Sequence, residues 1–265
     1  MRRSARSYLV GVVAVLVVAA VFAPGTAGAA KSKTTKLSGT ITVSAAASLT
    51  EAFTKMGTDF QQANPGTTVS FNFAASSALV QQIQGGAPAD AFASADGANM
   101  QKLVSGGQVK AEPTVFAANA LTIVVKPGNP KKIKSLADLA NVGTISLCAD
   151  TVPCGKYAQQ ALTTAGVAIP TDKITKGADV KATLAAVSTG DADAAIVYLT
   201  DAKAAGTAVQ AVKIPAWLNV YAIYPIAPLA SSTNADLADA WVKYTVSPAG
   251  QKTLQSYGFL APPLS

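Results

Sequence analysis

Three hydroxyl side chains stand where a β-rich run of residues meets a helical pattern. Ser48 follows the run 39–47, Ser76 follows the run 67–75, and Tyr198 ends the run "AAIVY". A hydroxyl group can donate a hydrogen bond. The first N–H groups of a helix lack intrahelical partners and carry the positive end of the helix dipole. Such groups bind an anion without any charged side chain, so these positions predict an anion-binding site.

Two further helix starts follow predicted strands and offer main-chain donors. Cys154 follows the strand that ends at Asp150 and precedes the predicted helix 155–166. Val180 stands at the start of the predicted helix 179–190. If the fold brings these helix starts together, their free N–H groups add to the same site.

Two of the hydroxyl groups also have ordinary structural explanations. Ser48-Leu49-Thr50-Glu51 fits the S-x-x-E capping box, in which the serine only caps the helix. Tyr198 taken alone is explained by a half-buried tyrosine with a satisfied hydroxyl group. The recurrence of the same layout at Ser76 favours a binding site, and the capping alternative stays open.

The sequence lacks the residue types that common hydrolases need. It contains no histidine, which excludes Ser-His-Asp and Cys-His catalysis and removes the commonest zinc ligand. We find no G-x-S-x-G motif, no S-x-x-K motif after the N-terminal segment and no P-loop. We therefore expect that the protein is not an enzyme and binds no cofactor. A secreted serine hydrolase is the alternative from a different class of function.

Residues 1–29 have the layout of a secretory signal peptide. Three arginines precede an apolar stretch from Leu9 to Ala23, and Ala27-Gly28-Ala29 resembles a cleavage site. The stretch is short for a membrane span, which needs roughly 20 apolar residues, and an uncleaved anchor is the alternative. Residues 30–36 form a basic leader. We therefore expect export to the periplasm or to the outside of the cell, in association with the cell envelope.

The formal net charge of +7 does not indicate a nucleic-acid partner. Residues 1–36 hold six of the basic residues and none of the acidic ones, which leaves 15 basic against 14 acidic residues. Binding to a phosphate backbone requires a basic surface, so we expect no nucleic-acid partner. Half of the residues are hydrophobic, which is enough to build a core.

The two cysteines, Cys148 and Cys154, flank the loop before one predicted helix start. Export permits a disulfide bond and no third cysteine competes, so we hypothesise a bond between them. Free thiols are the alternative. The bond would fix the N–H group of Cys154 before a ligand arrives, and such pre-ordering raises affinity.

Strand and helix patterns alternate along the chain. The predicted strands are 39–47, 67–75, 89–96, 120–125, 143–150, 194–199 and 220–230. The predicted helices begin near 49, 76, 97, 135, 155 and 179, and a last one over 234–259 is broken at Pro248. This order predicts an α/β fold with a parallel sheet covered on both faces. We expect two lobes, 37–120 plus 225–265 and 121–224, with the ligand in the cleft between them.

Five segments carry a family resemblance. They are "ITVSAAASLTEAF", "FAASSALVQQIQGGAPADAFASAD", "ADTVPCGKYAQQAL", "DVKATLAAV" and "AAIVYLTDA". Together they resemble the molybdate-binding extracellular subunit of ABC transporters, from about residue 40 to the C-terminus. The resemblance implies a type II periplasmic-binding-protein fold and a tetrahedral oxyanion that uncharged donors hold in the cleft.

The resemblance also implies the ligand contacts. Carried over by position, they fall on Ser48, Ser76, Cys154, Val180 and Tyr198. The serines and the tyrosine would donate hydroxyl groups, and the other two residues main-chain N–H groups. The family usually has a small residue such as alanine where this chain has Cys154, and a main-chain donor tolerates that change. Molybdenum would enter only as the oxyanion, with no metal ion bound directly.

Other anions remain as alternatives. Tungstate is a second candidate ligand, and a sulfate or phosphate receptor of the same fold is the alternative function. Phosphate stays partly protonated near neutral pH and needs an acceptor carboxylate. Asp150, four positions before Cys154, is the carboxylate considered for that role, and phosphate is disfavoured. The partners implied are a membrane permease of an ABC transporter and its ATPase, and we expect a monomer.

Overall fold

A single sheet path connects the strands of residues 36–263, the part of the chain that the computed structural model describes. The strand order is β2-β1-β3-β9-β4-β7-β5-β6, and β8 pairs with β4. The strands are β1 (Gly39–Ala46), β2 (Thr67–Ala74), β3 (Ala91–Ala93), β4 (Thr114–Val125), β5 (Ile145–Cys148), β6 (Ile174–Gly177), β7 (Ala194–Tyr198), β8 (Gln210–Lys213) and β9 (Tyr221–Pro228). The predicted signal peptide, and the basic leader before Lys36, lie outside the described residues.

Eight α-helices and four 3-10 helices lie within these described residues. The α-helices are α1 (Thr50–Ala63), α2 (Ser76–Gln84), α3 (Gly97–Ser105), α4 (Pro153–Thr164), α5 (Val180–Ser188), α6 (Leu199–Ala205), α7 (Ala235–Val246) and α8 (Pro248–Ser256). The 3-10 helices are η1 (Ala47–Leu49), η2 (Ala137–Asn141), η3 (Thr171–Lys173) and η4 (Gly206–Ala208). None of the helices in 36–263 is both long and apolar enough to span a membrane.

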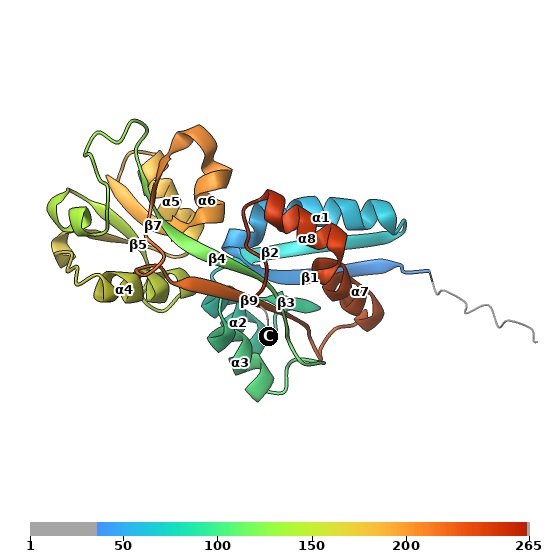
Figure 1. Cartoon of the computed structure of the whole chain (residues 1–265). Coiled ribbons are helices and arrows are strands. Elements are labelled where there is room, and N and C mark those ends of the chain that lie inside the picture. The colour runs from blue at the N-terminus through green and yellow to red at the C-terminus, as the bar shows by residue number, and fades with distance from the viewer. Residues whose placement is uncertain (1–35, 264–265) are drawn as a thin grey trace, which may run out of the picture. The chain divides into compact units, whose positions relative to one another are not determined.

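The long strand β4 changes its partners along its length (Figure 1). Residues 114–120 pair with β9, whereas residues 121–125 pair with β7 and β8. We call β1, β2, β3, β9 and the first part of β4 the first sheet section, and the remaining strands the second. The predicted lobe boundary at 120/121 falls at this change of partner, and the division into lobes stays a prediction.

The sheet is mixed rather than parallel throughout. β1 pairs with β2 and β3 in parallel, and β5 pairs with β6 and β7 in parallel. The strands β4 and β9 pair antiparallel with each other and with their other neighbours. The expectation of a parallel sheet was therefore right for both outer parts and wrong for the middle. There the chain passes from one section to the other and back, as the extended run 220–230 predicts.

Helices cover both faces of the first sheet section. The core that involves α1, α7 and α8 contains an aromatic cluster in which Trp241 meets Phe53 and Phe60 edge-on, at 5.4 and 5.6 Å between ring centroids. A second, smaller cluster under α2 and α3 includes Leu79 and Leu103. Edge-to-face aromatic pairs add to the burial energy. The predicted break at Pro248 is present: α7 ends at Val246, and Ser247 caps α8 through the Gly250 N–H group.

Several element predictions need correction. The strand predicted at 120–125 begins six residues earlier, and the helix predicted from 135 is only the 3-10 turn η2. The elements β6, β8 and α6 were not predicted from the sequence. β6 and β8 have four residues each and α6 has seven, with no buried position in β6 or β8. Segments this short carry too few apolar positions for periodicity to reveal them.

Candidate functional site

One small cavity gathers every predicted ligand position. The residues that line it include Ser48, Ser76, Cys154, Val180 and Tyr198. The cavity has a volume of about 20 Å³, and one water molecule needs about 10–15 Å³ on the same measure. The site therefore suits a small ligand. That these residues bind one stays a prediction.

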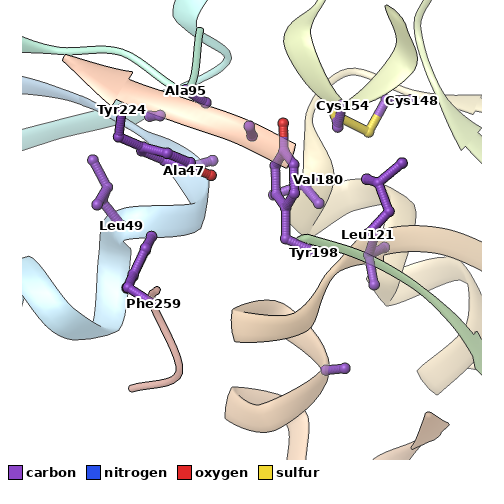
Figure 2. Packing of buried hydrophobic residues seen from close by; sticks show 14 of the residues in the cluster. Ala47, Leu49, Ala95, Leu121, Cys148, Cys154, Val180, Tyr198, Tyr224 and Phe259 are labelled. Atoms are coloured by element: carbon purple, nitrogen blue, oxygen red, sulfur yellow. A yellow bond between two sulfur atoms is a disulfide. The ribbon is translucent and has the colours of Figure 1, made fainter. Parts of the chain in front are cut away.

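Four helix starts and one strand end build this cavity. η1 follows β1, α2 follows β2, α4 follows β5, and α5 follows β6, while Tyr198 ends β7. In Figure 2, Ala47 and Ala95 lie on one side of Tyr198, and Val180 and Cys154 lie on the other. The walls consist largely of small residues, which let a ligand approach the main chain closely.

The N-terminal N–H groups of α4 and α5 are free to face a ligand. Pro153 opens α4 and has no N–H group, so Cys154 supplies the first one. Asp179 caps α5 by accepting a hydrogen bond from the Ala182 N–H group at 2.9 Å. Within residues 36–263 no hydrogen bond occupies the N–H group of Cys154 or of Val180. Both are first-turn groups that no intrahelical carbonyl can satisfy.

The Ser48 hydroxyl group is buried and oriented by other side chains. Its Oγ atom lies 2.8 Å from the Tyr224 hydroxyl oxygen. Asn119 Oδ1 accepts from the Ala120 N–H group, and Asn119 Nδ2 donates to Tyr224 at 3.4 Å and to Thr200 Oγ1 at 2.8 Å. Because Tyr224 accepts from Asn119, its own hydrogen is available to Ser48. Ser48 then keeps its hydrogen for the cavity.

Ser76 is prepared in the same way. Its Oγ atom accepts a hydrogen bond from the Ala95 N–H group at 3.0 Å, which leaves its hydrogen for the cavity. The sequence alone does not separate Ser76 from Ser77. The structure does, because Ser76 lines this cavity and Ser77 does not.

The Tyr198 hydroxyl group is buried without a hydrogen-bond partner among the described residues. Burial raises the pKa of Tyr198 well above its ordinary value, and the electrostatic effect of the neighbouring Tyr224 raises it further. The group therefore stays protonated and can donate at neutral pH. The alternative of a half-buried tyrosine with a satisfied hydroxyl group is therefore wrong, because Tyr198 is fully buried and its hydroxyl group has no partner among the described residues. Such a group is costly unless a ligand supplies the missing hydrogen bond.

Among the described residues, only one carboxylate belongs to the cavity lining. Asp179 is the one acidic residue in its lining, and that side chain already caps α5. Asp150, four positions before Cys154, lies outside the lining and pairs with Lys176 at 2.6 Å. The cavity thus offers mainly hydrogen-bond donors, and the one carboxylate in its lining has an oxygen engaged in the cap. Within residues 36–263 no group of three His, Cys, Asp or Glu side chains could hold a metal ion.

The disulfide bond that the sequence analysis expects is present in the structure. Cys148 ends β5 and Cys154 lies in the first turn of α4, six residues later. Gly155 fits closely beside them, because a Cβ atom there would lie 2.0 Å from the Ala149 carbonyl oxygen. Bond and glycine together hold the start of α4 against the end of β5.

The capping-box alternative for Ser48 is wrong. α1 begins at Thr50, its N-cap residue is Leu49, and no side chain caps it. The Glu51 carboxylate does not reach back to residue 48 but accepts from Lys181 Nζ at 2.7 and 2.8 Å. A short 3-10 turn separates Ser48 from α1 and turns its hydroxyl group toward Tyr224.

The contacts of Tyr224, Asn119 and Lys181 near the cavity were not predicted from the sequence. Asn119 lies on β4 and Tyr224 on β9, and these strands pair only through the fold. One signal was available: Asn119 stands inside a long apolar run, and a buried amide needs partners.

Comparison with known proteins fits this architecture. The family model for bacterial extracellular solute-binding proteins matches residues 41–260. The chain belongs to this family. The match covers every element that lines the cavity, so the site of this solute-binding protein lies inside the shared fold.

Individual relatives narrow the comparison. This solute-binding protein is 38% identical to the molybdate-binding protein ModA of Mycobacterium tuberculosis, over 95% of this chain and 97% of the relative. Among solved structures it resembles the periplasmic molybdate-binding protein of Azotobacter vinelandii, with a TM-score of 0.74 and 20% identity over 84% of this chain and all of that one. The sulfate-binding protein SubI of M. tuberculosis has a TM-score of 0.75 and 20% identity over 83% of this chain and 86% of that one. The two structures support the periplasmic solute-binding fold.

Proposed function

We propose that this chain captures the molybdate dianion outside the cytoplasm and delivers it to the membrane permease of an ABC transporter, which an ATPase drives. The observation that carries the proposal is the donor-rich cavity. Ser48, Ser76 and Tyr198 offer hydroxyl hydrogens, and Cys154 and Val180 offer main-chain N–H groups. The relative of 38% identity is a molybdate-binding protein, which favours this tetrahedral oxyanion over others.

The dianion's charge is balanced without a cation. Two helix N-termini, those of α4 and α5, direct their dipoles and free N–H groups at the cavity. Hydrogen bonds to a charged group contribute roughly 1.5–3 kcal/mol each. Five such donors can therefore hold a small dianion tightly, even after the cost of removing it from water.

Phosphate is disfavoured by the same donors. Near neutral pH part of the phosphate carries a proton that needs an acceptor, and the one carboxylate in the lining, Asp179, already uses an oxygen to cap α5. Molybdate, tungstate and sulfate carry no proton there. Sulfate is the second candidate, because the fold also occurs in a sulfate-binding protein.

Transport requires export and release. The signal-peptide pattern of residues 1–29 supports export, and membership of the extracellular solute-binding family supports a transport role rather than hydrolysis. The protein would act as a monomer whose two predicted lobes close on the anion. Scattering with and without molybdate tests this, because closure lowers the radius of gyration.

Calorimetric titration decides the ligand. The mature protein is titrated in parallel with molybdate, tungstate, sulfate and phosphate. We expect molybdate to bind most tightly or equally with tungstate, sulfate more weakly and phosphate weakest. Tighter binding of sulfate would make sulfate the ligand instead of molybdate. Tight binding of phosphate would show that the cavity supplies an acceptor, against the interpretation that donors dominate it.

A further inference from the structure

Three charged side chains follow three of the cavity residues in sequence. Glu51 comes three positions after Ser48, Lys181 comes directly after Val180, and Asp201 comes three positions after Tyr198. The proposed function gives none of the three a role. They lie on three different helices, α1, α5 and α6, yet the fold brings them together.

Lys181 stands between the two carboxylates. Its Nζ atom lies 2.7 Å from Glu51 Oε2 and 3.0 Å from Asp201 Oδ1. Among the described residues, Lys181 is the only basic side chain within ion-pair distance of either carboxylate. A single ammonium group therefore joins the helix starts next to the cavity.

The two ion pairs differ in burial. Asp201 is fully buried, whereas the Glu51 side chain is 39% exposed and the Lys181 side chain 27% exposed. Burial raises the pKa of Asp201 to about 6, against the opposing pull of Lys181. For Lys181, burial alone would lower the pKa, but Asp201 and Glu51 outweigh it and raise the pKa. Lys181 therefore remains a cation at neutral pH.

The two pairs also differ in what they connect. Lys181 and Asp201 both belong to helices that pack on the second sheet section, so their pair lies within one part of the fold. Glu51 belongs to α1, which packs on β2 of the first sheet section. The pair of Glu51 and Lys181 thus connects the two sheet sections, next to the cavity residues Ser48 and Val180.

We propose that Lys181 is a clasp for the binding cavity: held in place by Asp201, its ammonium group binds Glu51 and keeps the starts of α5 and α1 on opposite sides of the bound anion. The clasp fixes the spacing between the Val180 N–H group and the Ser48 hydroxyl group. It touches no ligand itself, so Lys181 and Glu51 are positioning residues. The role of the clasp in ligand retention rests on the proposed function.

The matched test compares Glu51→Gln with Asp59→Asn. Both changes remove one carboxylate charge from α1 and keep a similar shape. Among the described residues Asp59 pairs only with Lys55 on the same helix, so its loss breaks an ion pair that does not join the two sheet sections. Glu51 is partly exposed, so Glu51→Gln leaves no buried charge without a partner and should fold.

Molybdate dissociation is measured by stopped flow and affinity by calorimetry. We expect Glu51→Gln to release molybdate about threefold to tenfold faster than the wild type, between the values for exposed and buried ion pairs. Asp59→Asn should match the wild type. The difference should shrink as the salt concentration rises from about 10 to about 500 mM, because partly exposed ion pairs are screened. Unchanged release from Glu51→Gln would overturn the clasp. Slower release would also overturn it, and would mean that the Glu51 carboxylate merely repels the anion.

A second measurement does not depend on the ligand. Hydrogen exchange of the unliganded protein is followed in peptides over residues 176–186, at the start of α5. We expect faster exchange in Glu51→Gln than in Asp59→Asn, and equal exchange would overturn the clasp. If the wild type binds none of the four oxyanions, the proposed function fails, and the exchange result alone decides whether Lys181 ties α5 to α1.

Discussion

Replacing Tyr198 by phenylalanine should move stability and affinity in opposite directions. The Tyr198 hydroxyl group is buried and has no partner among the described residues. An unsatisfied buried hydroxyl group costs about 1–3 kcal/mol, and phenylalanine keeps the ring without that group. The unliganded Tyr198→Phe protein should therefore be more stable than the wild type by a figure of that order.

Affinity should fall in the same variant. The hydroxyl group is one of the donors to the proposed dianion, and a hydrogen bond to a charged group is worth about 1.5–3 kcal/mol. At 1.4 kcal/mol per factor of ten, molybdate affinity should drop about tenfold to 150-fold. The stabilisation of the folded state at a fixed molybdate concentration falls by the same energy while binding stays near saturation.

Thermal unfolding and calorimetry together check both signs. The control is Tyr221→Phe, because Tyr221 is exposed on β9 and does not line the cavity. Its unfolding temperature and molybdate affinity should equal those of the wild type. Equal affinity in Tyr198→Phe would show that the hydroxyl group does not touch the ligand. A less stable unliganded Tyr198→Phe protein would show that the group has a partner, and the reasoning would fail.

Three further predictions, with four substitutions, test groups in and around the cavity. Ser48→Ala and Tyr224→Phe should each weaken molybdate binding, and the double variant should lose less than the sum by at least about 0.5 kcal/mol in calorimetry, since Tyr224 acts through Ser48. Cys148→Ser should lower the free energy of unfolding by about 2–2.5 kcal/mol in a denaturant titration, because the open loop has more entropy in the unfolded state. If this variant binds molybdate as tightly as the wild type, the disulfide bond serves stability alone. With a folded-state pKa of about 6 against 3.8, Asp201 binds its proton more tightly in the folded protein, so stability should fall as the pH rises from about 4 to about 6. Asp201→Asn should remove that fall, on the order of 2–3 kcal/mol, in unfolding curves across this range, and an unchanged pH profile would contradict it.

The sequence predicts the strand-to-helix junctions well because each has a local signal. Small residues after β1, the glycine stop after α2 and the proline at the break between α7 and α8 act within a few residues of the chain. The anion-site positions follow from the same junctions, because a helix start after a parallel strand has a predictable place at the sheet edge. This is why the five predicted ligand positions line one cavity.

The parts that escaped prediction depend on contacts between distant residues. Ser48 and Tyr224 are 176 positions apart, and Lys181 and Glu51 are 130 apart. Nothing local distinguishes Glu51 in a capping box from Glu51 in an ion pair, because both uses require a carboxylate at the same place in the first turn of α1. Only the approach of α5 decides between them.

The hydrogen bonds behind Ser48 and Ser76 and the ion pairs of Lys181 serve one binding cavity in different ways. A cavity that binds a dianion through neutral donors must keep each hydrogen pointed inward, since a hydroxyl group can turn and present a lone pair instead. Tyr224 and the Ala95 N–H group occupy the lone pairs of Ser48 and Ser76, so the direction of each donor is set before the anion arrives. Pre-set donors add little reorganisation cost on binding.

The charged groups, by contrast, lie outside the cavity lining, where Lys181 neutralises carboxylates that would otherwise repel the anion and holds the two helix starts in place. Donor orientation and helix spacing are therefore separate tasks, and variants of Tyr224 and Glu51 should separate them in affinity and in dissociation rate.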